Sequence, residues 1–297
     1  MKRKIIMLTG WLLLTLNCGN NNDLNTDDVR ATAQIRVHVN DFSFSQENFP
    51  DAYTRADADP ISYNNVKAID LAIFSGETTV YEATQLRADA KTYTTFGEFE
   101  CKLPSGSYTI VAIARNLSDG DVFSITSPTQ AAYTSERARE TFCYTQNVTV
   151  VDNTPIDINP AMKRVMAQFQ IVSKDALPSN VATIRTTYAA GSKSFNPTTG
   201  LAIDDNGFVV TNSAKATKSG GIDVYSILFL ASDEETIDVT IDVLDADKNV
   251  LMTKSVPNIH FKRNRITKAT GNLFTPGSST LTFTLDTSWL SEEIVEF

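Results

Sequence analysis

Residues 31–45 read Ala-Thr-Ala-Gln-Ile-Arg-Val-His-Val-Asn-Asp-Phe-Ser-Phe-Ser, and the rest of the fold is expected to form around this stretch. Apolar and polar residues alternate from Ile35 to Asn40, and the apolar ones are β-branched. Alternation of period two with β-branched residues predicts a strand that buries one face and exposes the other. We therefore expect residues 31–45 to form the first strand of the folded protein.

A polar segment follows this strand and contains Pro50 and the tripeptide Thr54-Arg55-Ala56. A trypsin-like protease cuts after arginine, and a polar segment is accessible to such an enzyme. Cleavage between Arg55 and Ala56 would detach the first strand, and the sheet that lost it would have to pair with another strand. Arg30, directly before the strand, is an alternative cleavage site, and a lone arginine in a loop is also often only a solvated charge.

The amino terminus has the pattern of an export signal. Residues 1–17 carry three basic residues directly after Met1 and continue into an apolar run. This run is shorter than the roughly 20 apolar residues that a membrane-spanning helix needs. Leu14-Thr-Leu-Asn-Cys18 is similar to a bacterial lipobox, although Thr15 and Asn17 depart from the preferred residues. An ordinary cleaved signal peptide with an incidental cysteine is the alternative interpretation.

Residues 18–30 form a polar tether between the leader and the first strand. Its run of Asn, Asp, Gly and Thr cannot bury enough apolar surface to fold, and it suits a spacer that separates a domain from a membrane. For this reason we favour a lipoprotein precursor in which Cys18 is the lipidated residue.

Composition and charge exclude some classes of function. The chain has 297 residues, of which 42% are hydrophobic and 21% charged, as in a globular protein with one large domain or two ordinary ones. Its net charge is −9. A nucleic-acid-binding surface needs a basic face, so we expect no nucleic acid among the partners.

Two further cysteines, Cys101 and Cys143, lie in segments that we expect to be strands. Export to an oxidising compartment makes a disulfide between them possible. Two buried free thiols agree equally well with the sequence, because the positions of two cysteines do not fix their geometry.

The rest of the chain is predicted to consist of strands and turns, without a long segment of helical period. Residues 131–141 are the best candidate for a short helix or an irregular crossover, and Asn206-Gly207 is the strongest hairpin-turn signal. The other expected strands cover residues 66–74, 78–81, 96–103, 108–114, 145–151, 155–158, 165–172, 182–188, 200–203, 225–230, 236–243, 250–256 and 280–286.

This pattern predicts an all-β protein with two tandem β-sandwich domains of similar size. A fresh sheet pattern begins after Asn159-Pro160, so we place the N-terminal domain at residues 31–159 and the C-terminal domain at residues 160–297.

Residues that could carry catalysis or bind a metal are scarce. The chain has two histidines, His38 and His260, each inside an expected strand, and it has no phosphate-binding loop or nucleophile elbow. Residues 245–249 are similar to the first half of a calcium loop, but the Gly and the later Glu are missing, so a hairpin turn is favoured. We predict no catalytic residue, no metal site and no cofactor. Four tyrosines could stack on sugars, although packing is their commoner role: Tyr63, Tyr81, Tyr93 and Tyr133.

Several segments, in their order along the chain, resemble the FimA-like fimbrillins, which are lipoprotein-derived pilins of Bacteroidetes. The resemblance covers nearly the whole exported part of the chain, and no single motif in it is specific. The matching segments are the leader with Cys18, Phe42-Ser-Phe44, Thr54-Arg55-Ala56, Leu103 to Ala112, Met162 to Phe169, Phe261 to Thr267, and Phe283 to Trp289.

The resemblance implies two transthyretin-like (Greek-key) β-sandwich domains and export as a precursor anchored by lipid in the outer membrane. It also implies cleavage by an arginine-specific protease outside the cell, at Arg55–Ala56, with loss of the strand at 31–45. The subunits would then join into a pilus by strand exchange, with a C-terminal donor strand around Leu281, Phe283 and Leu285. The partners implied are other pilin subunits, and the role is structural, in cell adhesion.

The resemblance leaves open whether the chain is a stalk, anchor or tip subunit. An alternative function is a surface lipoprotein that binds glycan through its β-sandwich domains. A third possibility, an extracellular hydrolase, is disfavoured by the missing histidine and nucleophile patterns.

Overall fold

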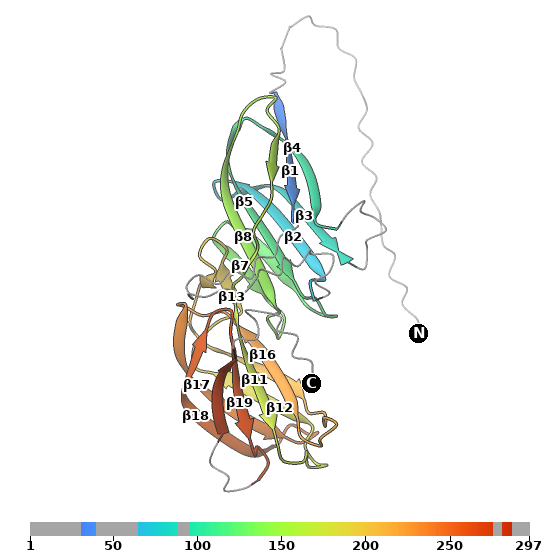
Figure 1. Cartoon of the computed structure of the whole chain (residues 1–297), viewed down its shortest axis with the longest axis vertical. Helices are drawn as coiled ribbons and strands as arrows, with labels where there is room; N and C mark the ends of the chain where they lie inside the picture. Colours follow the sequence, from blue (N-terminus) through green and yellow to red (C-terminus); the bar gives the residue numbers. More distant parts are fainter. Residues whose placement is uncertain (1–30, 40–64, 88–95, 276–280, 287–297) are drawn as a thin grey trace, which may run out of the picture. The chain divides into compact units, whose positions relative to one another are not determined.

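The structure is a computed structural model that describes residues 31–39, 65–87, 96–275 and 281–286. These residues form β-strands, turns and loops, and no α-helix occurs among them (Figure 1). The strands assemble into five sheets of three to five strands each. The prediction of an all-β protein is therefore confirmed.

Two sheets with strand orders β4-β1-β9 and β10-β8-β5-β2-β3 enclose the first core. β5 is the central strand of the larger sheet, as its two-sided apolar pattern predicts, and every residue from Ala68 to Phe74 of β2 is buried. The bounds are β1 Thr32–His38, β2 Ala68–Ser75, β3 Thr78–Leu86, β4 Glu98–Pro104, β5 Gly106–Arg115, β8 Thr141–Val150, β9 Ile156–Ile158 and β10 Lys163–Arg164.

Two further sheets, β16-β11-β19-β20 and β15-β12-β17-β18, enclose the second core. Phe169 packs edge-on against Tyr188 and Phe261 at its centre, with ring centroids 6.2 and 5.7 Å apart. The bounds are β11 Ala167–Ser173, β12 Thr183–Tyr188, β15 Phe208–Ser213, β16 Asp223–Leu228, β17 Glu234–Leu244, β18 Val250–Lys262, β19 Ile266–Gly271 and β20 Leu281–Asp286.

The hairpin of β17 and β18 confirms the clearest pairing in the sequence. Ile237, Val239 and Ile241 are buried along one face of β17. In the turn, the Asp245 carboxylate accepts hydrogen bonds from the backbone N–H groups of Asp247 and Asn249, at 3.0 and 2.8 Å. Residues 245–249 therefore form the expected hairpin turn, because the carboxylate that could have faced a metal is used to fix the backbone.

The fifth sheet, β14-β13-β7-β6, combines strands from both halves of the chain. Its strands are β6 Phe123–Ser127, β7 Gln130–Tyr133, β13 Ser194–Asn196 and β14 Leu201–Ala202. A third apolar cluster lies with it, in which the rings of Phe195 and Phe229 stack 4.4 Å apart. Strands from before and after Asn159-Pro160 thus share a sheet, and the proposed domain division at that point stays a prediction.

One local prediction left open was decided, and one was wrong. Of the two alternatives for residues 131–141, a short helix or an irregular crossover, the structure has the irregular one, because the segment begins within β7 and continues without regular structure until β8. Asn206-Gly207 does not close a hairpin, because β14 pairs with β13 while β15 pairs with β12 in another sheet. Gly207, at φ +70°, instead lets the chain pass close to the end of β12. The N–H of Gly207 donates to the carbonyl of Gly191, which follows that strand, at 3.1 Å.

Candidate functional site

β1 lies in the middle of the three-stranded sheet, between β4 and β9. It pairs antiparallel with β4 from Thr32 opposite Pro104 to His38 opposite Glu98. It pairs parallel with β9, where Ile35 lies opposite Ile156. Among the described residues, β4 and β9 form ladders with no other strand. Removal of β1 would therefore leave two strands with unpaired backbone groups on either side of an open slot.

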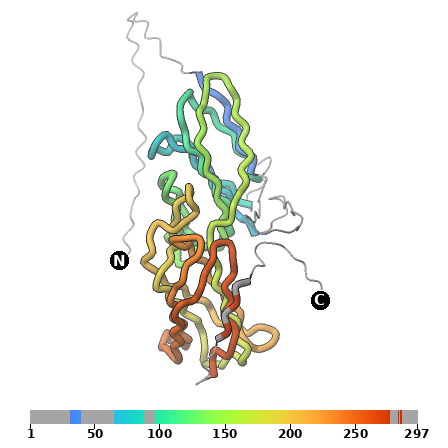
Figure 2. Tube along the Cα trace, turned by 60° about the vertical axis from the view of Figure 1, so that its left-hand side comes forward, coloured from blue at the N-terminus to red at the C-terminus, as the bar shows by residue number. Residues whose placement is uncertain are grey.

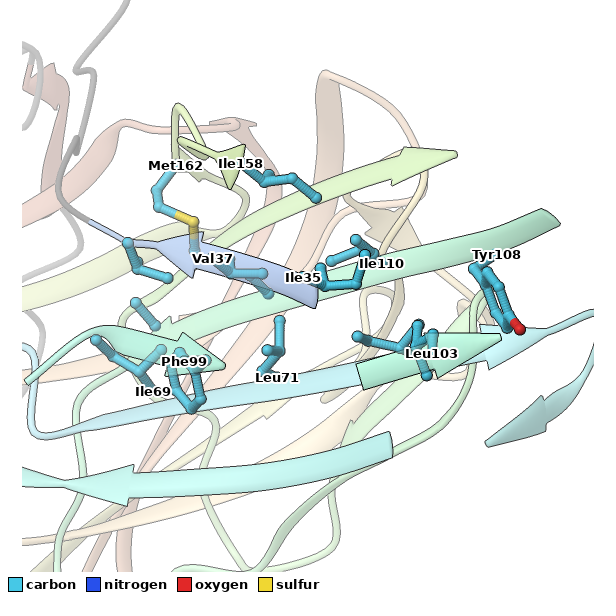
Figure 3. Close-up of a cluster of buried hydrophobic side chains, with 14 of the residues drawn as sticks. Ile35, Val37, Ile69, Leu71, Phe99, Leu103, Tyr108, Ile110, Ile158 and Met162 are labelled. Carbon is cyan, nitrogen blue, oxygen red and sulfur yellow. The ribbon is translucent and has the colours of Figure 1, made fainter. Parts of the chain in front are cut away.

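The inward face of β1 confirms the alternation predicted for its sequence. Ala33, Ile35, Val37 and Val39 are at most 1% exposed. Figure 3 shows Ile35 and Val37 directed into a cluster that also contains side chains of β2, β4 and β5, including Leu71, Leu103 and Ile110. Complete burial of a Val or Ile side chain contributes about 1.5–3 kcal/mol. Loss of β1 would therefore expose an apolar groove that a replacement strand would be driven to fill.

The outward face of β1 is basic, and its neighbours there are acidic. Arg36 lies between two carboxylates, with Nε 3.7 Å from Glu100 on β4 and Nη1 3.5 Å from Asp157 on β9. His38 contacts Glu98 through Nδ1, and its Nε2 lies 3.7 Å from Asp157. Arg36 and His38 therefore each link β1 to both of its neighbours.

The start of β4, where the last residues of β1 dock, is held by a side chain from the opposite sheet. Gln85 on β3 is buried, its Nε2 donates to the Glu98 carbonyl at 2.6 Å, and its Oε1 accepts from the Gly97 N–H at 2.7 Å. Because these bonds do not involve β1, they help to keep β4 in place when β1 is absent.

The structure brings together only part of the predicted site. Leu281, Phe283 and Leu285 lie on β20, which pairs with β19 at the edge of its sheet and not with β1. The lipidation candidate Cys18 and the cleavage candidates Arg55 and Ala56 lie outside the described residues. Their roles stay predictions.

A carboxylate holds the chain just before β20. Asp175 accepts hydrogen bonds from the backbone N–H groups of Leu273, Phe274 and Thr275 at 2.7 to 2.9 Å, and from Ser173. Burial alone would raise the pKa of Asp175, but the hydrogen bonds to its charged form outweigh burial and lower it below its ordinary value. Asp175 therefore fixes the backbone of residues 273–275, which follow β19.

Four residues of the site were not identified from the sequence: Gln85, Glu98, Glu100 and Asp157. Gln85 stands in an ordinary strand pattern, which gives no signal that its side chain caps another strand. Asp157 lies between Ile156 and Ile158 in a short strand, and this isolated acidic position could have indicated an outward charge facing a neighbour.

The two remaining cysteines are free thiols. Burial raises the pKa of Cys143 to about 12, and burial together with the nearby Glu100 raises that of Cys101 to about 11. Of the two alternatives, a disulfide or two free thiols, the structure has the free thiols. Because their pKa values are raised, both thiols are poor nucleophiles.

A polar hollow of about 200 Å³ provides a second candidate site. Tyr225, 53% exposed, lies at its edge, and Arg139 is fixed there by a bidentate ion pair with Asp121 at 2.7 and 2.8 Å. The hollow is lined by Asn65, Asn116, Arg139, Glu140, Gln168, Tyr225 and Ile227. Amide, carboxylate and guanidinium groups beside an aromatic ring are suited to polyhydroxylated ligands.

In the described part of the chain, no group of three or more His, Cys, Asp and Glu side chains is arranged to hold a metal ion. No helix there is long and apolar enough to cross a membrane.

The chain belongs to a family of unknown function, DUF6562, which matches residues 26–296. No curated protein matches the sequence. Among solved structures, it is similar to a protein of Bacteroides thetaiotaomicron described as a candidate polysaccharide-binding protein (DUF1812), with a TM-score of 0.51. The two are 10% identical, and the likeness covers 86% of this chain and 96% of the other. This TM-score shows a shared fold.

Two further likenesses have lower TM-scores. The fimbrial anchor protein Mfa2 of Porphyromonas gingivalis has a TM-score of 0.47 and 10% identity, over 86% of this chain and 95% of that one. A candidate adhesin of Bacteroides ovatus has a TM-score of 0.45 and 12% identity, over 77% of this chain and 79% of that one.

Proposed function

We propose that this chain is a non-enzymatic subunit of a cell-surface fimbria that acts in adhesion and is assembled by strand exchange. In this proposal it is exported as a precursor with a lipid on Cys18 in the outer membrane. An arginine-specific protease then cuts at Arg55–Ala56, and β1 is replaced by a strand of another subunit.

The observation that carries the proposal is the position of β1. It is the middle strand of its sheet, three of its side chains and that of Val39 directly after it are buried, and it precedes the Arg55 bond in the chain. Removal of a middle strand creates two unpaired ladders and an apolar groove at once, and a strand from a neighbour restores both. Repeated head to tail, such a contact does not close and gives a filament.

The resemblance of the sequence to FimA-like fimbrillins supports the same role. The assignments of the cleavage site, of the lipid anchor and of β20 as a donor strand all follow from this resemblance. The edge position of β20 agrees with that suggestion, because an edge strand can leave its sheet by breaking a single ladder.

Limited proteolysis tests the proposal. The purified precursor would be treated with trypsin, its intact mass recorded, and its oligomeric state followed by size-exclusion chromatography. We expect one early cut after Arg55, with oligomers appearing as the first strand leaves. Arg55→Ala should block both the cut and the oligomers while the monomer stays folded. Arg30→Ala, at the alternative site, is the matched control and should polymerise normally.

Two results would contradict the proposal. Filaments formed normally by Arg55→Ala would reject this cleavage site. A clean cut after Arg55 with a stable monomer would reject strand exchange between copies of this chain, and strand exchange itself would be rejected if the cut chain also failed to take up an added peptide of residues 31–45. For the anchor, Cys18→Ser should release the precursor from the membrane fraction and abolish its labelling with a fatty-acid analogue.

The second candidate function is glycan binding, and two observations favour it. The solved structure with the shared fold is described as a candidate polysaccharide-binding protein, and the polar hollow beside Tyr225 has suitable chemistry. Under this alternative the intact monomer binds a glycan without proteolysis. Glycan-array binding that is lost in Tyr225→Ala but kept in Tyr81→Ala, on β3, would support it; an empty array would reject it.

A further inference from the structure

We propose that the slot left by β1 selects a donor strand with Lys or Arg on its outward face, contributed by a different polypeptide. The C-terminal strand of a second copy of this chain would be disfavoured. This inference rests on the proposed strand exchange and specifies the chemistry of its partner.

The two strands that border the slot carry an acidic outward face. Glu98 and Glu100 on β4 and Asp157 on β9 all contact Arg36 or His38 of β1. The other charged residue on these two strands is Lys102, which lies opposite Gln34. Once β1 leaves, the outward faces of the two strands that border the slot carry three carboxylates and one lysine.

β1 itself shows what the slot accommodates. Its outward positions 36 and 38 hold Arg36 and His38, which contact these carboxylates, and its inward positions hold Ala33, Ile35 and Val37. Opposite charges directly across strands stabilise a sheet, and like charges there destabilise it. A replacement strand with the same alternation and cations at both outward positions would keep every one of these pairs.

The C-terminal segment of this chain does not match that pattern. Residues 276–297 contain four carboxylates and no Lys, Arg or His. If Leu281, Phe283 and Leu285 took the inward positions, the outward ones would be Thr282, Thr284 and Asp286, which supply no cation and add a fourth carboxylate to the slot. Phe283 would also have to fit where β1 places a smaller side chain, and overpacking of a filled core is destabilising.

Peptide exchange tests the inference on the full chain. A recognition sequence for a specific protease would replace Arg55-Ala56, and the cut chain would be incubated with fluorescent peptides. The peptides are residues 31–45, the same peptide with Arg36→Gln and His38→Gln, residues 279–290, and the latter with Thr282→Arg and Thr284→Arg. Binding is measured by fluorescence anisotropy.

At low salt we expect the 31–45 peptide to bind about fivefold or more tightly than the version with two glutamines, because the contacts of Arg36 and His38 with the carboxylates are lost. This difference should shrink in 1 M salt. The 279–290 peptide should bind most weakly and gain affinity from the two arginines. As the control on the acceptor side, Glu100→Gln with Asp157→Asn should remove the preference among the peptides.

The outcomes separate this inference from the proposed function. If the version with two glutamines or the 279–290 peptide binds as tightly as residues 31–45, the slot has no charge preference and the inference is overturned. If no peptide enters the cut chain, residues 31–45 included, strand exchange itself fails and the inference fails with it.

Discussion

The backbone of Val39 lies against Gly97, where the Val39 N–H donates to the Gly97 carbonyl at 3.0 Å. Gly97 has φ +98°, and a Cβ added to it would lie 2.9 Å from the Val39 carbonyl oxygen. Val39 thus docks against a position where only glycine fits without strain. This contact fixes the backbone of Val39 beside the start of β4.

Gly97→Ala is expected to destabilise the fold by about 1–3 kcal/mol, because it adds both backbone strain and a steric clash. Urea unfolding would measure the loss. Gly76→Ala is the matched control, since Gly76 also has positive φ (+59°) but has no atom within 4 Å of the added Cβ. Equal losses in the two variants would show that the contact with Val39 does not matter.

A buried ion pair joins β2 to β5. Arg115 Nε lies 2.7 Å from Asp70 Oδ2, both side chains are nearly inaccessible, and Thr84 donates a further hydrogen bond to Asp70. Asp70→Ala should cost about 3–5 kcal/mol, because it leaves the Arg115 charge buried without its partner.

The double variant Asp70→Leu with Arg115→Met should recover much of that loss, since a buried pair is often replaceable by apolar residues. Arg115 Nη1 has no hydrogen-bond partner among the described residues, which makes such replacement easier. Asp157→Ala, which removes a half-exposed partner of Arg36, should cost under about 1 kcal/mol. An Asp70→Ala variant as stable as Asp157→Ala would contradict this account.

The Asp175 carboxylate should make the C-terminal strand sensitive to acid. Its pKa in the folded protein is below the ordinary value, so the stability it provides is present above about pH 4. That stability is lost as the pH falls through the lowered pKa. Hydrogen exchange of the amides of residues 273–275 and of β20 should therefore speed up selectively in this acid range, and Asp175→Ala should show fast exchange already at pH 7. Unchanged exchange in that variant would reject the role of Asp175.

The thiols of Cys101 and Cys143 should react slowly with Ellman's reagent at pH 8, because their raised pKa values leave little thiolate. In a Cys18→Ser chain we expect at least a tenfold acceleration when guanidinium unfolds the protein. Two rapidly reacting thiols in the folded state would show that burial does not protect them.

Sequence alone predicts the strands well where apolar and polar residues alternate, because the apolar positions are then the buried ones. Ile35 and Val37 on β1, and Ile237 to Ile241 on β17, occupy the buried faces expected of them, because side-chain direction follows from strand geometry. Sheet membership is different, since it depends on contacts between residues far apart in the chain. Asn206-Gly207 carries the local chemistry of a hairpin, yet its flanking strands belong to different sheets.

In the candidate site, too, the direction of side chains is predictable from the sequence but their partners are not. The alternation of Arg36 and His38 with apolar residues indicates a charged outward face, but the carboxylates that meet them come from β4 and β9, about 60 and 120 positions later in the sequence. The parallel pairing with β9 and the cap from Gln85 likewise arise only from the tertiary arrangement, and no local pattern predicts them.

The mixed pairing of β1 gives the slot a polarity. A replacement that keeps both ladders has to run against β4 and along β9, which is the direction of β1 itself. If each subunit receives its strand in this one sense, all subunits in a fibre point the same way. Such a fibre has two unlike ends, one with an unfilled slot and one with an unused strand, so growth and termination become chemically distinct events.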